Sequence, residues 1–254
     1  MILLVDAGNT RIKWAELGNG VLKPGPALLR HGGAEDIDAL SASWGGLSTP
    51  ARILVANVAG TEFGSLLTAW SRRTWGVEPE FILSRPEGFG VTNAYLEPQR
   101  LGVDRWLALV AARRALAGPV CVIDCGTALT VDAMTKDGVH LGGLIMPGLG
   151  LMRRALLDNT ADIRVTFEDA APPRITVLAQ DTRGGVMGGT LYAAVATIDR
   201  IMRDLGAGTD SRLTCLLTGG DSGAILPLLS AEFDFRHEPD LVLQGLAIVA
   251  EVGR

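Results

Sequence analysis

A short pattern occurs twice in this chain and constrains its fold more than any other feature. The first copy, LLVDAGNTRIKWA, spans residues 3–15, and the second, CVIDCGTALTVDA, spans residues 121–133. In each copy an apolar run leads to an aspartate, a small residue, a glycine and a polar turn, and a second extended run follows. Each copy therefore predicts two strands joined by a tight turn. The repeat favours an internal duplication with a ligand between the halves.

Apolar runs and amphipathic stretches alternate along the rest of the chain. The segments predicted in this way are strands at Arg52–Asn57, Phe81–Leu83 and Leu213–Leu217, helices at Asp104–Ala117, Thr190–Leu205, Gly223–Leu229 and Leu241–Val252, and an acidic loop at Asp158–Pro173. Alternating strands and helices are typical of the α/β class.

The pair Gly118-Pro119 ends the predicted helix at Ala117 and divides the chain. We expect an N-terminal nucleotide and substrate domain at residues 1–117 and a C-terminal domain at residues 118–254. Whether the terminal helix packs back on the first domain is left open by the sequence. The expected architecture is two similar α/β domains.

Composition narrows the class of protein. Hydrophobic residues make up 48% of the 254 residues, which is enough for a substantial core, and the formal net charge is -5. An acidic chain is not typical of a general nucleic-acid binder. No uncharged apolar run reaches the length of a membrane span. Asp6 interrupts the first apolar run and no basic leader precedes it, so we expect no secretory signal and a cytoplasmic protein.

The sulfur and imidazole side chains show no metal-binding spacing. The chain has three cysteines, Cys121, Cys125 and Cys215, and three histidines, His31, His140 and His237. The cysteines form no C-x-x-C pair, so neither a disulfide framework nor a zinc site is predicted. Each histidine is interpreted as a surface residue or a satisfied core residue.

Several common catalytic motifs are absent. The sequence has no Walker A motif, no dinucleotide-binding G-x-G-x-x-G after the first strand and no H-E-x-x-H. Gly220-Asp221-Ser222-Gly223 is similar to the surroundings of some serine nucleophiles. A nucleophilic serine needs a histidine base, and none stands in a suitable sequence context. We therefore do not interpret Ser222 as a nucleophile.

Three aspartates follow apolar strands or begin a helix: Asp6, Asp104 and Asp124. Glycine- and threonine-containing turns at residues 8–10, 126–127 and 218–220 stand beside apolar runs. Phosphoryl transfer needs bound phosphates, a carboxylate-held metal and a group that accepts the alcohol proton. Asp6 suits Mg²⁺, and Asp104, beside a helix N-terminus and Arg105, suits the proton acceptor. A plain hairpin at Asp6, a helix N-cap at Asp104 and a surface ion pair at Arg105 remain open alternatives.

Four motifs in this order resemble the type III pantothenate kinases of the acetate-kinase, sugar-kinase, Hsc70 and actin-like superfamily. They are D-x-G-N-T-x-x-K from Asp6, G-x-D-R from Gly102, D-x-G-T-A-x-T from Asp124 and H-L-G-G-x-I-x-P-G from His140. The resemblance implies two actin/ribonuclease-H-like domains with a ligand cleft between them. It also implies ATP-dependent phosphorylation of pantothenate, the first step of coenzyme A synthesis, by a homodimer.

The resemblance also implies roles for individual residues. The ATP phosphate loop corresponds to Asp6, Ala7, Gly8, Asn9, Thr10, Arg11, Ile12 and Lys13, and Thr127 is a further ATP contact. Pantothenate contacts correspond to Tyr95, Gly102, Val103, Asp104, Arg105 and Thr182. Asp104 is the proton acceptor, Asp6 the Mg²⁺ ligand, and Asp124 the ligand of a monovalent cation, K⁺ or NH₄⁺.

Some assignments depart from the family or stay open. Arg105 can serve either the pantothenate carboxylate or Asp104. The glycine-rich stretch Gly184–Gly189 differs from the bulkier residues usual in the family, and this affects the assignment of Thr182. Cys125 occupies a position for small residues and is interpreted as a buried apolar side chain. The alternative functions are a non-catalytic regulatory protein that keeps the nucleotide site, and another kinase or phosphohydrolase of the superfamily.

Overall fold

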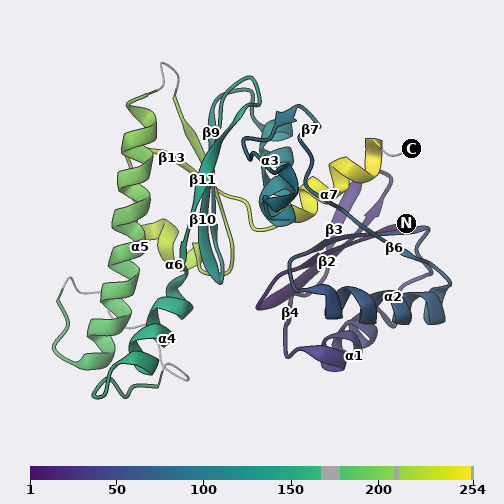
Figure 1. The fold of residues 1–254 in the computed structure, drawn as a ribbon, viewed down its shortest axis with the longest axis horizontal. Coiled ribbons are helices and arrows are strands. Elements are labelled where there is room, and N and C mark those ends of the chain that lie inside the picture. The colour runs from purple at the N-terminus through teal and green to yellow at the C-terminus, as the bar shows by residue number, and fades with distance from the viewer. Residues whose placement is uncertain (167–177, 209–211, 253–254) are drawn as a thin grey trace. The chain divides into compact units, whose positions relative to one another are not determined.

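The computed structural model describes residues 1–166, 178–208 and 212–252 of the chain, which divides into two compact units (Figure 1). The first unit comprises Met1–Ala117, Met134–Gly142 and Asp240–Arg254, and the second comprises Gly118–Ala133 and Gly143–Pro239. The part of the predicted acidic loop from residue 167 onwards lies outside the described residues.

The sheet of the first unit has the strand order β3-β2-β1-β5-β6, with β4 paired to β2. Its strands are β1 (Ile2–Ala7), β2 (Arg11–Gly18), β3 (Val21–Pro24), β4 (Leu28–Leu29), β5 (Arg52–Asn57) and β6 (Pro79–Phe81). The first sequence repeat forms the antiparallel hairpin β1–β2, in which Asp6 lies opposite Lys13. Because β5 runs parallel to β1, the turns that follow both strands lie at the same edge of the sheet.

Helices pack on this sheet. They are α1 (Gly33–Trp44), α2 (Thr61–Trp75), α3 (Val103–Ala115) and the terminal α7 (Leu241–Val252); two short strands, β7 (Glu87–Gly88) and β8 (Val91–Thr92), and a 3₁₀ turn at Pro98–Arg100 precede α3. Side chains alternate along β1, and Leu3 and Val5 join the apolar side chains of α1 and α2 in one core. α7 packs on β1 and α3. Gly245 permits close approach, since a Cβ there would lie 2.2 Å from the Leu107 carbonyl oxygen.

The sheet of the second unit has the strand order β11-β10-β9-β12-β13. Its strands are β9 (Val120–Cys125), β10 (Ala128–Met134), β11 (His140–Pro147), β12 (Thr214–Thr218) and β13 (Asp234–His237), and its helices are α4 (Leu149–Asn159), α5 (Thr182–Gly206) and α6 (Ser222–Ile225), with a 3₁₀ turn at Leu226–Leu228. The second sequence repeat forms β9 and β10. β12 runs parallel to both β9 and β13, so the ends of β9 and β12 are neighbours.

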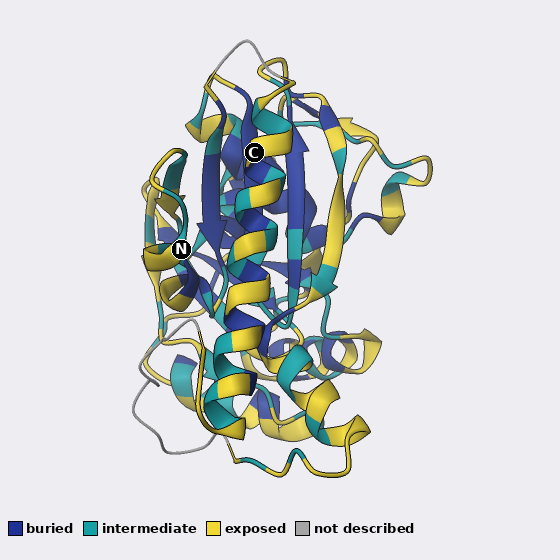
Figure 2. Ribbon diagram, turned by 90° about the vertical axis from the view of Figure 1, so that its left-hand side faces the viewer, coloured by how far each residue is buried: buried dark blue, intermediate teal, exposed yellow. Residues whose placement is uncertain are grey.

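The long helix α5 begins earlier than the sequence predicts, at Thr182 instead of Thr190. The Asp181 carboxylate accepts a hydrogen bond of 2.7 Å from the Gly184 N–H and so caps the helix. Glycine costs about 1 kcal/mol per residue inside a helix. The apolar side of α5, with Leu191 and Ile198, is buried in the core of the second unit and offsets that cost, while the other side is exposed (Figure 2).

Two strands differ from the sequence predictions. β6 lies two residues before the predicted Phe81–Leu83. β13 was not predicted, because it has no alternating apolar pattern and forms by pairing with β12. Among the described residues, no helix combines the length and apolar character needed to cross a membrane.

Candidate active site

The turn of the first hairpin lies between the ends of β1 and β2. The Gly8 N–H donates to the Arg11 carbonyl oxygen at 3.0 Å, and a Cβ on Gly8 would lie only 3.0 Å from that oxygen. Asn9 and Thr10 are exposed at the tip. The turn therefore presents polar backbone and side-chain groups to solvent, as a phosphate-binding loop must.

Asp6 is half-buried at the end of β1, directly before this turn. No group of three or more His, Cys, Asp or Glu side chains that could hold a metal ion was found among the described residues. Mg²⁺ in kinases is commonly held by one or two carboxylates together with substrate phosphates. The donor chemistry at Asp6 thus fits Mg²⁺ that binds together with a nucleotide.

The turn of the second repeat is tied to two other strand ends. The Gly148 N–H, after β11, donates to the Thr127 carbonyl oxygen at 3.0 Å. The Asp221 N–H, after β12, donates to the Cys125 carbonyl oxygen at 2.9 Å. Three loops of the second unit therefore converge around Gly126 and Thr127.

Glycines make this convergence possible. Gly219 has a φ of 92°, and a Cβ there would lie 2.3 Å from the Asp124 carboxylate and 2.5 Å from the Cys125 carbonyl carbon. A Cβ on Gly148 would lie 2.1 Å from the Gly126 carbonyl oxygen. The Asp124 carboxylate thus lies close to backbone groups, in space that a side chain at Gly219 would fill. Carboxylate and carbonyl oxygens are ligands that K⁺ takes, so the donor set fits a monovalent cation.

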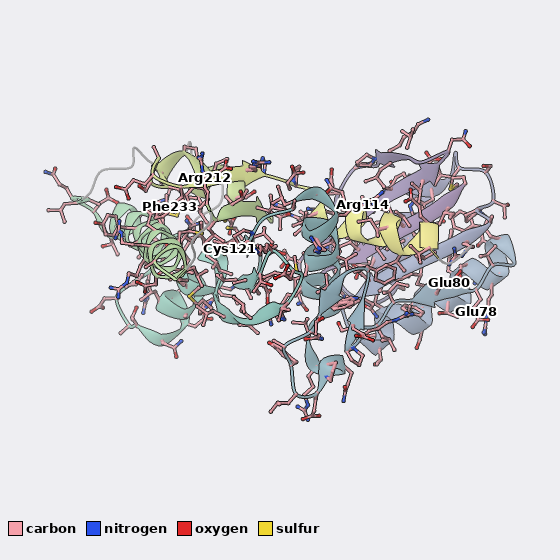
Figure 3. The ribbon with its side chains drawn as sticks, turned by 90° about the horizontal axis from the view of Figure 1, so that it is seen from above. Glu78, Glu80, Arg114, Cys121, Arg212 and Phe233 are labelled. Atoms are coloured by element: carbon pink, nitrogen blue, oxygen red, sulfur yellow. The ribbon has the colours of Figure 1, made fainter. Side chains whose placement is uncertain are left out.

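Cys125 lies inside this junction and is 1% exposed. Burial, followed by the neighbouring Asp124 and Asp221 charges, raises the pKa of the Cys125 thiol to about 12. The thiol is therefore protonated at neutral pH and unreactive. Cys121 and Cys215 are also buried and free, as expected from their spacing; Figure 3 labels Cys121 on β9.

Ser222 has a histidine neighbour that the sequence did not reveal. The Ser222 hydroxyl lies 2.8 Å from His237 Nε2 and donates to the Gly219 carbonyl oxygen at 2.7 Å. Ser222 is 2% exposed, so no substrate reaches it. The pair supports the Gly219 turn, and the rejection of a serine nucleophile stands for a different reason.

Asp104 lies in the first turn of α3, directly after the helix start at Val103. One oxygen of its carboxylate accepts a hydrogen bond of 2.8 Å from the Arg105 N–H. A Cβ on Gly102 would lie 2.5 Å from the same carboxylate, so a side chain there would displace the Asp104 carboxylate from this position. Gly102, and not Asp104, is the residue at the N-cap position. The half-buried carboxylate of Asp104 is thus held by local backbone at a helix N-terminus.

Arg105, Tyr95 and His140 form one cluster in the first unit. The Arg105 guanidinium donates to the Tyr95 hydroxyl at 2.8 Å and lies over the Tyr95 ring, 5.6 Å from its centroid. The His140 ring stacks on Tyr95 with centroids 6.2 Å apart, and its Nδ1 accepts from the Ala94 N–H at 3.4 Å. His140 is 2% exposed, which agrees with a core histidine. Sequence analysis missed its contact with Tyr95, although His140 begins one of the recognised motifs.

The remaining candidates divide between the two units. The first unit carries the phosphate-loop residues, Tyr95 and the Gly102–Arg105 segment, and the second carries Asp124, Thr127 and Thr182. Ala7 and Ile12 are fully buried in the first core, so any ligand contact from them goes through the backbone. Val103 is 8% exposed and also packs inward. Thr182 is exposed at the start of α5.

Several solved structures share this architecture. The chain matches a structure described as a 2-dehydro-3-deoxygalactonokinase from Sinorhizobium meliloti with a TM-score of 0.60 and 15% identity, over 99% of both chains. It matches a structure described as a Baf family transcriptional activator from Campylobacter jejuni with a TM-score of 0.60 and 18% identity, over 99% of this chain and 98% of the other. The fold is that of the two-domain actin-like α/β proteins, which confirms the predicted class.

Sequence comparison is more specific. The profile of the family "Type III pantothenate kinase" matches residues 2–204. A protein from Nitrosococcus oceani named type III pantothenate kinase is 44% identical over 257 aligned positions, which cover 99% of this chain and 94% of that protein. The chain belongs to the type III pantothenate kinase family, and the resemblance found in its motifs is confirmed.

Proposed function

We propose that this protein transfers the γ-phosphoryl group of ATP to pantothenate and forms 4′-phosphopantothenate, the first step of coenzyme A biosynthesis. The observation that carries the proposal is the family match over residues 2–204, which includes both copies of the aspartate–glycine turn. The position of Asp104, beside the Arg105–Tyr95 pair, supports it.

In the proposed reaction the primary hydroxyl of pantothenate attacks the γ-phosphorus of ATP. A bond forms between that oxygen and phosphorus, the bond to the β–γ bridging oxygen breaks, and ADP leaves. Asp104 accepts the hydroxyl proton and orients the alcohol. The α3 N-terminus favours the charged carboxylate. Arg105 and Tyr95, together with Gly102, Val103 and Thr182, contact pantothenate.

The proposed phosphate-binding residues on the first unit are the loop Asp6–Lys13, and Thr127 is a separate proposed ATP contact on the second unit. The exposed turn residues of the loop and Lys13 bind the β- and γ-phosphates. Asp6 holds Mg²⁺, which neutralises charge on the phosphates when it is bound. Asp124 holds the monovalent cation, K⁺ or NH₄⁺, on the second unit.

Asp6→Asn should raise the Mg²⁺ concentration needed for half-maximal activity by about 10-fold, because a neutral amide binds a hard cation more weakly than a carboxylate does. The measurement is initial rate against free Mg²⁺ at saturating ATP. The structural control is Asp38→Asn, which changes an exposed acid on α1. A Mg²⁺ titration identical to that of the unmodified protein would remove Asp6 from the metal site.

Tyr95→Phe should raise the KM for pantothenate by about 10-fold, because it removes a hydrogen bond from the charged Arg105. The ring and its stacking with His140 remain, so the fold should be kept. The KM for ATP should not change. Steady-state kinetics with each substrate varied in turn makes the comparison. A rise confined to the KM for ATP would contradict the assignment of Tyr95 to the pantothenate site.

We further propose that the protein is a cytoplasmic homodimer. Exposed apolar side chains on the second unit, Leu144 and Ile145 on β11 and Tyr192 on α5, support an interface between copies. Light scattering coupled to size exclusion should give twice the mass of the 26.7 kDa chain. A monomer across the micromolar range would contradict the dimer.

The direct test of function uses purified protein with ATP, Mg²⁺, a K⁺ or NH₄⁺ salt and pantothenate. We expect 4′-phosphopantothenate and ADP in equal amounts. The alternative is a purely regulatory protein, because the similar Campylobacter jejuni structure is described as a transcriptional activator. Complementation of a strain lacking pantothenate kinase would distinguish the enzyme from such a regulator. A panel of small alcohols separates pantothenate from other acceptors. Absence of product across several salts would reject the proposal.

A further inference from the structure

A nearly buried ion pair lies beside the turn at residues 8–10 of the first unit, the proposed phosphate turn. Arg30 Nε donates to Asp36 Oδ2 at 2.8 Å, and the two side chains are 14% and 0% exposed. The second carboxylate oxygen, Oδ1, accepts from the His31 and Gly32 N–H groups at 2.7 and 3.1 Å. Both oxygens of Asp36 are therefore used, and the pair fixes the segment that enters α1.

Arg30 contacts the phosphate turn with both its side chain and its backbone. Arg30 Nη1 lies within 3.4 Å of the Gly8 carbonyl oxygen and 3.5 Å of the Ala59 carbonyl oxygen. The Arg30 N–H donates to the Thr10 carbonyl oxygen at 2.9 Å. The guanidinium also lies over the Phe63 ring of α2, 5.7 Å from its centroid. One arginine thus links the turn to α1, to α2 and to the loop after β5.

These contacts determine which way the turn's peptide groups face. A trans peptide directs its carbonyl and its N–H in opposite directions. Because Arg30 holds the carbonyl of Gly8, the N–H of Asn9 faces away from Arg30. The Arg30 N–H holds the Thr10 carbonyl in the same way, and this orients the peptide between Thr10 and Arg11. A turn whose N–H groups are already oriented binds phosphate without a further ordering cost.

We propose that the Arg30–Asp36 ion pair is a positioning device that pre-orients the Gly8–Thr10 turn for the β- and γ-phosphates of ATP. Neither side chain needs to contact the nucleotide. This inference rests on the proposed function only for the identity of the nucleotide. It goes beyond that function by assigning a role to two residues outside every recognised motif.

The decisive variant is Asp36→Asn. Asparagine keeps an acceptor for the His31 and Gly32 N–H groups but loses the carboxylate oxygen that holds Arg30. Removal of a negative charge near the site should by itself strengthen the binding of anionic ATP. Loss of the positioning pair should instead weaken it, by about 10-fold to 100-fold. The sign of the change in the dissociation constant for MgATP therefore separates positioning from a simple charge effect.

The matched controls come from a second ion pair in the same unit. Arg52 on β5 donates two hydrogen bonds of 2.7 Å to Glu80 on β6; Figure 3 labels Glu80. Glu80→Gln removes the same charge and weakens an Arg–carboxylate pair that is more exposed and doubly hydrogen-bonded, with neither residue in contact with the turn. We expect Glu80→Gln to leave the MgATP dissociation constant unchanged or slightly lower.

The experiment is calorimetric titration of each folded variant with MgATP, followed by steady-state kinetics. Arg30→Met should weaken MgATP binding, as Asp36→Asn does, and the double variant should bind no more weakly than either single variant. Arg30→Lys, which keeps a charged donor for Asp36, should recover part of the loss. The KM for pantothenate should stay unchanged in all of these variants.

The outcomes separate the two proposals. Unchanged or tighter MgATP binding in Asp36→Asn would overturn the positioning role even if the enzyme makes 4′-phosphopantothenate. Weakened binding in Asp36→Asn and Arg30→Met, but not in Glu80→Gln, would support it even if pantothenate proves not to be the acceptor. An equal rise in the KM for both substrates would indicate general damage to the first unit and would also overturn it.

Discussion

Asp104→Asn should lower kcat by about 10²-fold to 10⁴-fold, the range typical of losing a positioned proton acceptor. Asparagine cannot take the hydroxyl proton of pantothenate, but its amide oxygen can still accept the hydrogen bond from the Arg105 N–H. The start of α3 should therefore be kept, and binding of both substrates should change little. Initial rates at saturating substrate, with thermal unfolding as the check on folding, make the measurement.

The control for this variant is Asp38→Asn, because Asp38 is exposed on α1 of the same unit and outside the proposed site. It should retain full activity. Near-normal kcat in Asp104→Asn would refute the role of Asp104. A loss of activity that accompanies a large fall in the melting temperature would instead show that Asp104 is needed for the helix start.

Gly219→Ala should destabilise the second unit and weaken MgATP binding, because the turn that carries Thr127 must shift. The backbone of Gly219 has a φ of 92°, a conformation that costs a non-glycine residue about 1–3 kcal/mol. The added Cβ would also lie 2.3 Å from the Asp124 carboxylate and within 2.6 Å of the Cys125 backbone nitrogen. Both the turn at Gly126 and the position of Asp124 must then shift. Urea unfolding and MgATP titration measure the two effects.

Gly223→Ala provides the comparison, since Gly223 lies in α6, four residues away, with nothing within 4 Å of an added Cβ. Alanine is favoured over glycine in a helix, so this variant should be as stable as the unmodified protein or slightly more stable. Equal stability and equal MgATP binding in both variants would show that the Gly219 junction tolerates a side chain, against the structure.

The parts of the fold that the sequence predicted depend on short-range patterns. The two aspartate–glycine turns and the start of α3 at Gly102–Arg105 are each readable within a few residues. β13 and the Ser222–His237 pair could not be predicted in this way, because each depends on pairing between segments distant in sequence. The early start of α5 was missed because glycines argue against a helix, whereas the cap at Asp181 and burial of the apolar side decide the outcome.

The candidate site likewise contains residues that motifs reveal and residues that only three-dimensional contacts reveal. Motif positions such as Asp6, Asp104 and Asp124 were chosen from the sequence, and their roles remain predictions. The supporting residues were not found, because neither Arg30 nor Asp36 stands in a motif. Their function follows from three-dimensional contacts with the Gly8–Thr10 turn. His140 was recognised as part of a motif, but its contact with Tyr95 depends on the folded unit.

The two copies of the repeated turn are held mainly in different ways, and this gives them different evolutionary freedom. The first depends on the Arg30–Asp36 pair, whereas the second depends chiefly on the close backbone approach that Gly148 and Gly219 permit. A charged pair can be weakened in small steps by conservative exchanges, so nucleotide affinity on that side is open to gradual adjustment. Glycine is the smallest residue, and any substitution at Gly148 or Gly219 would add a side chain that does not fit. Homologues should therefore vary around the first turn while the second stays fixed.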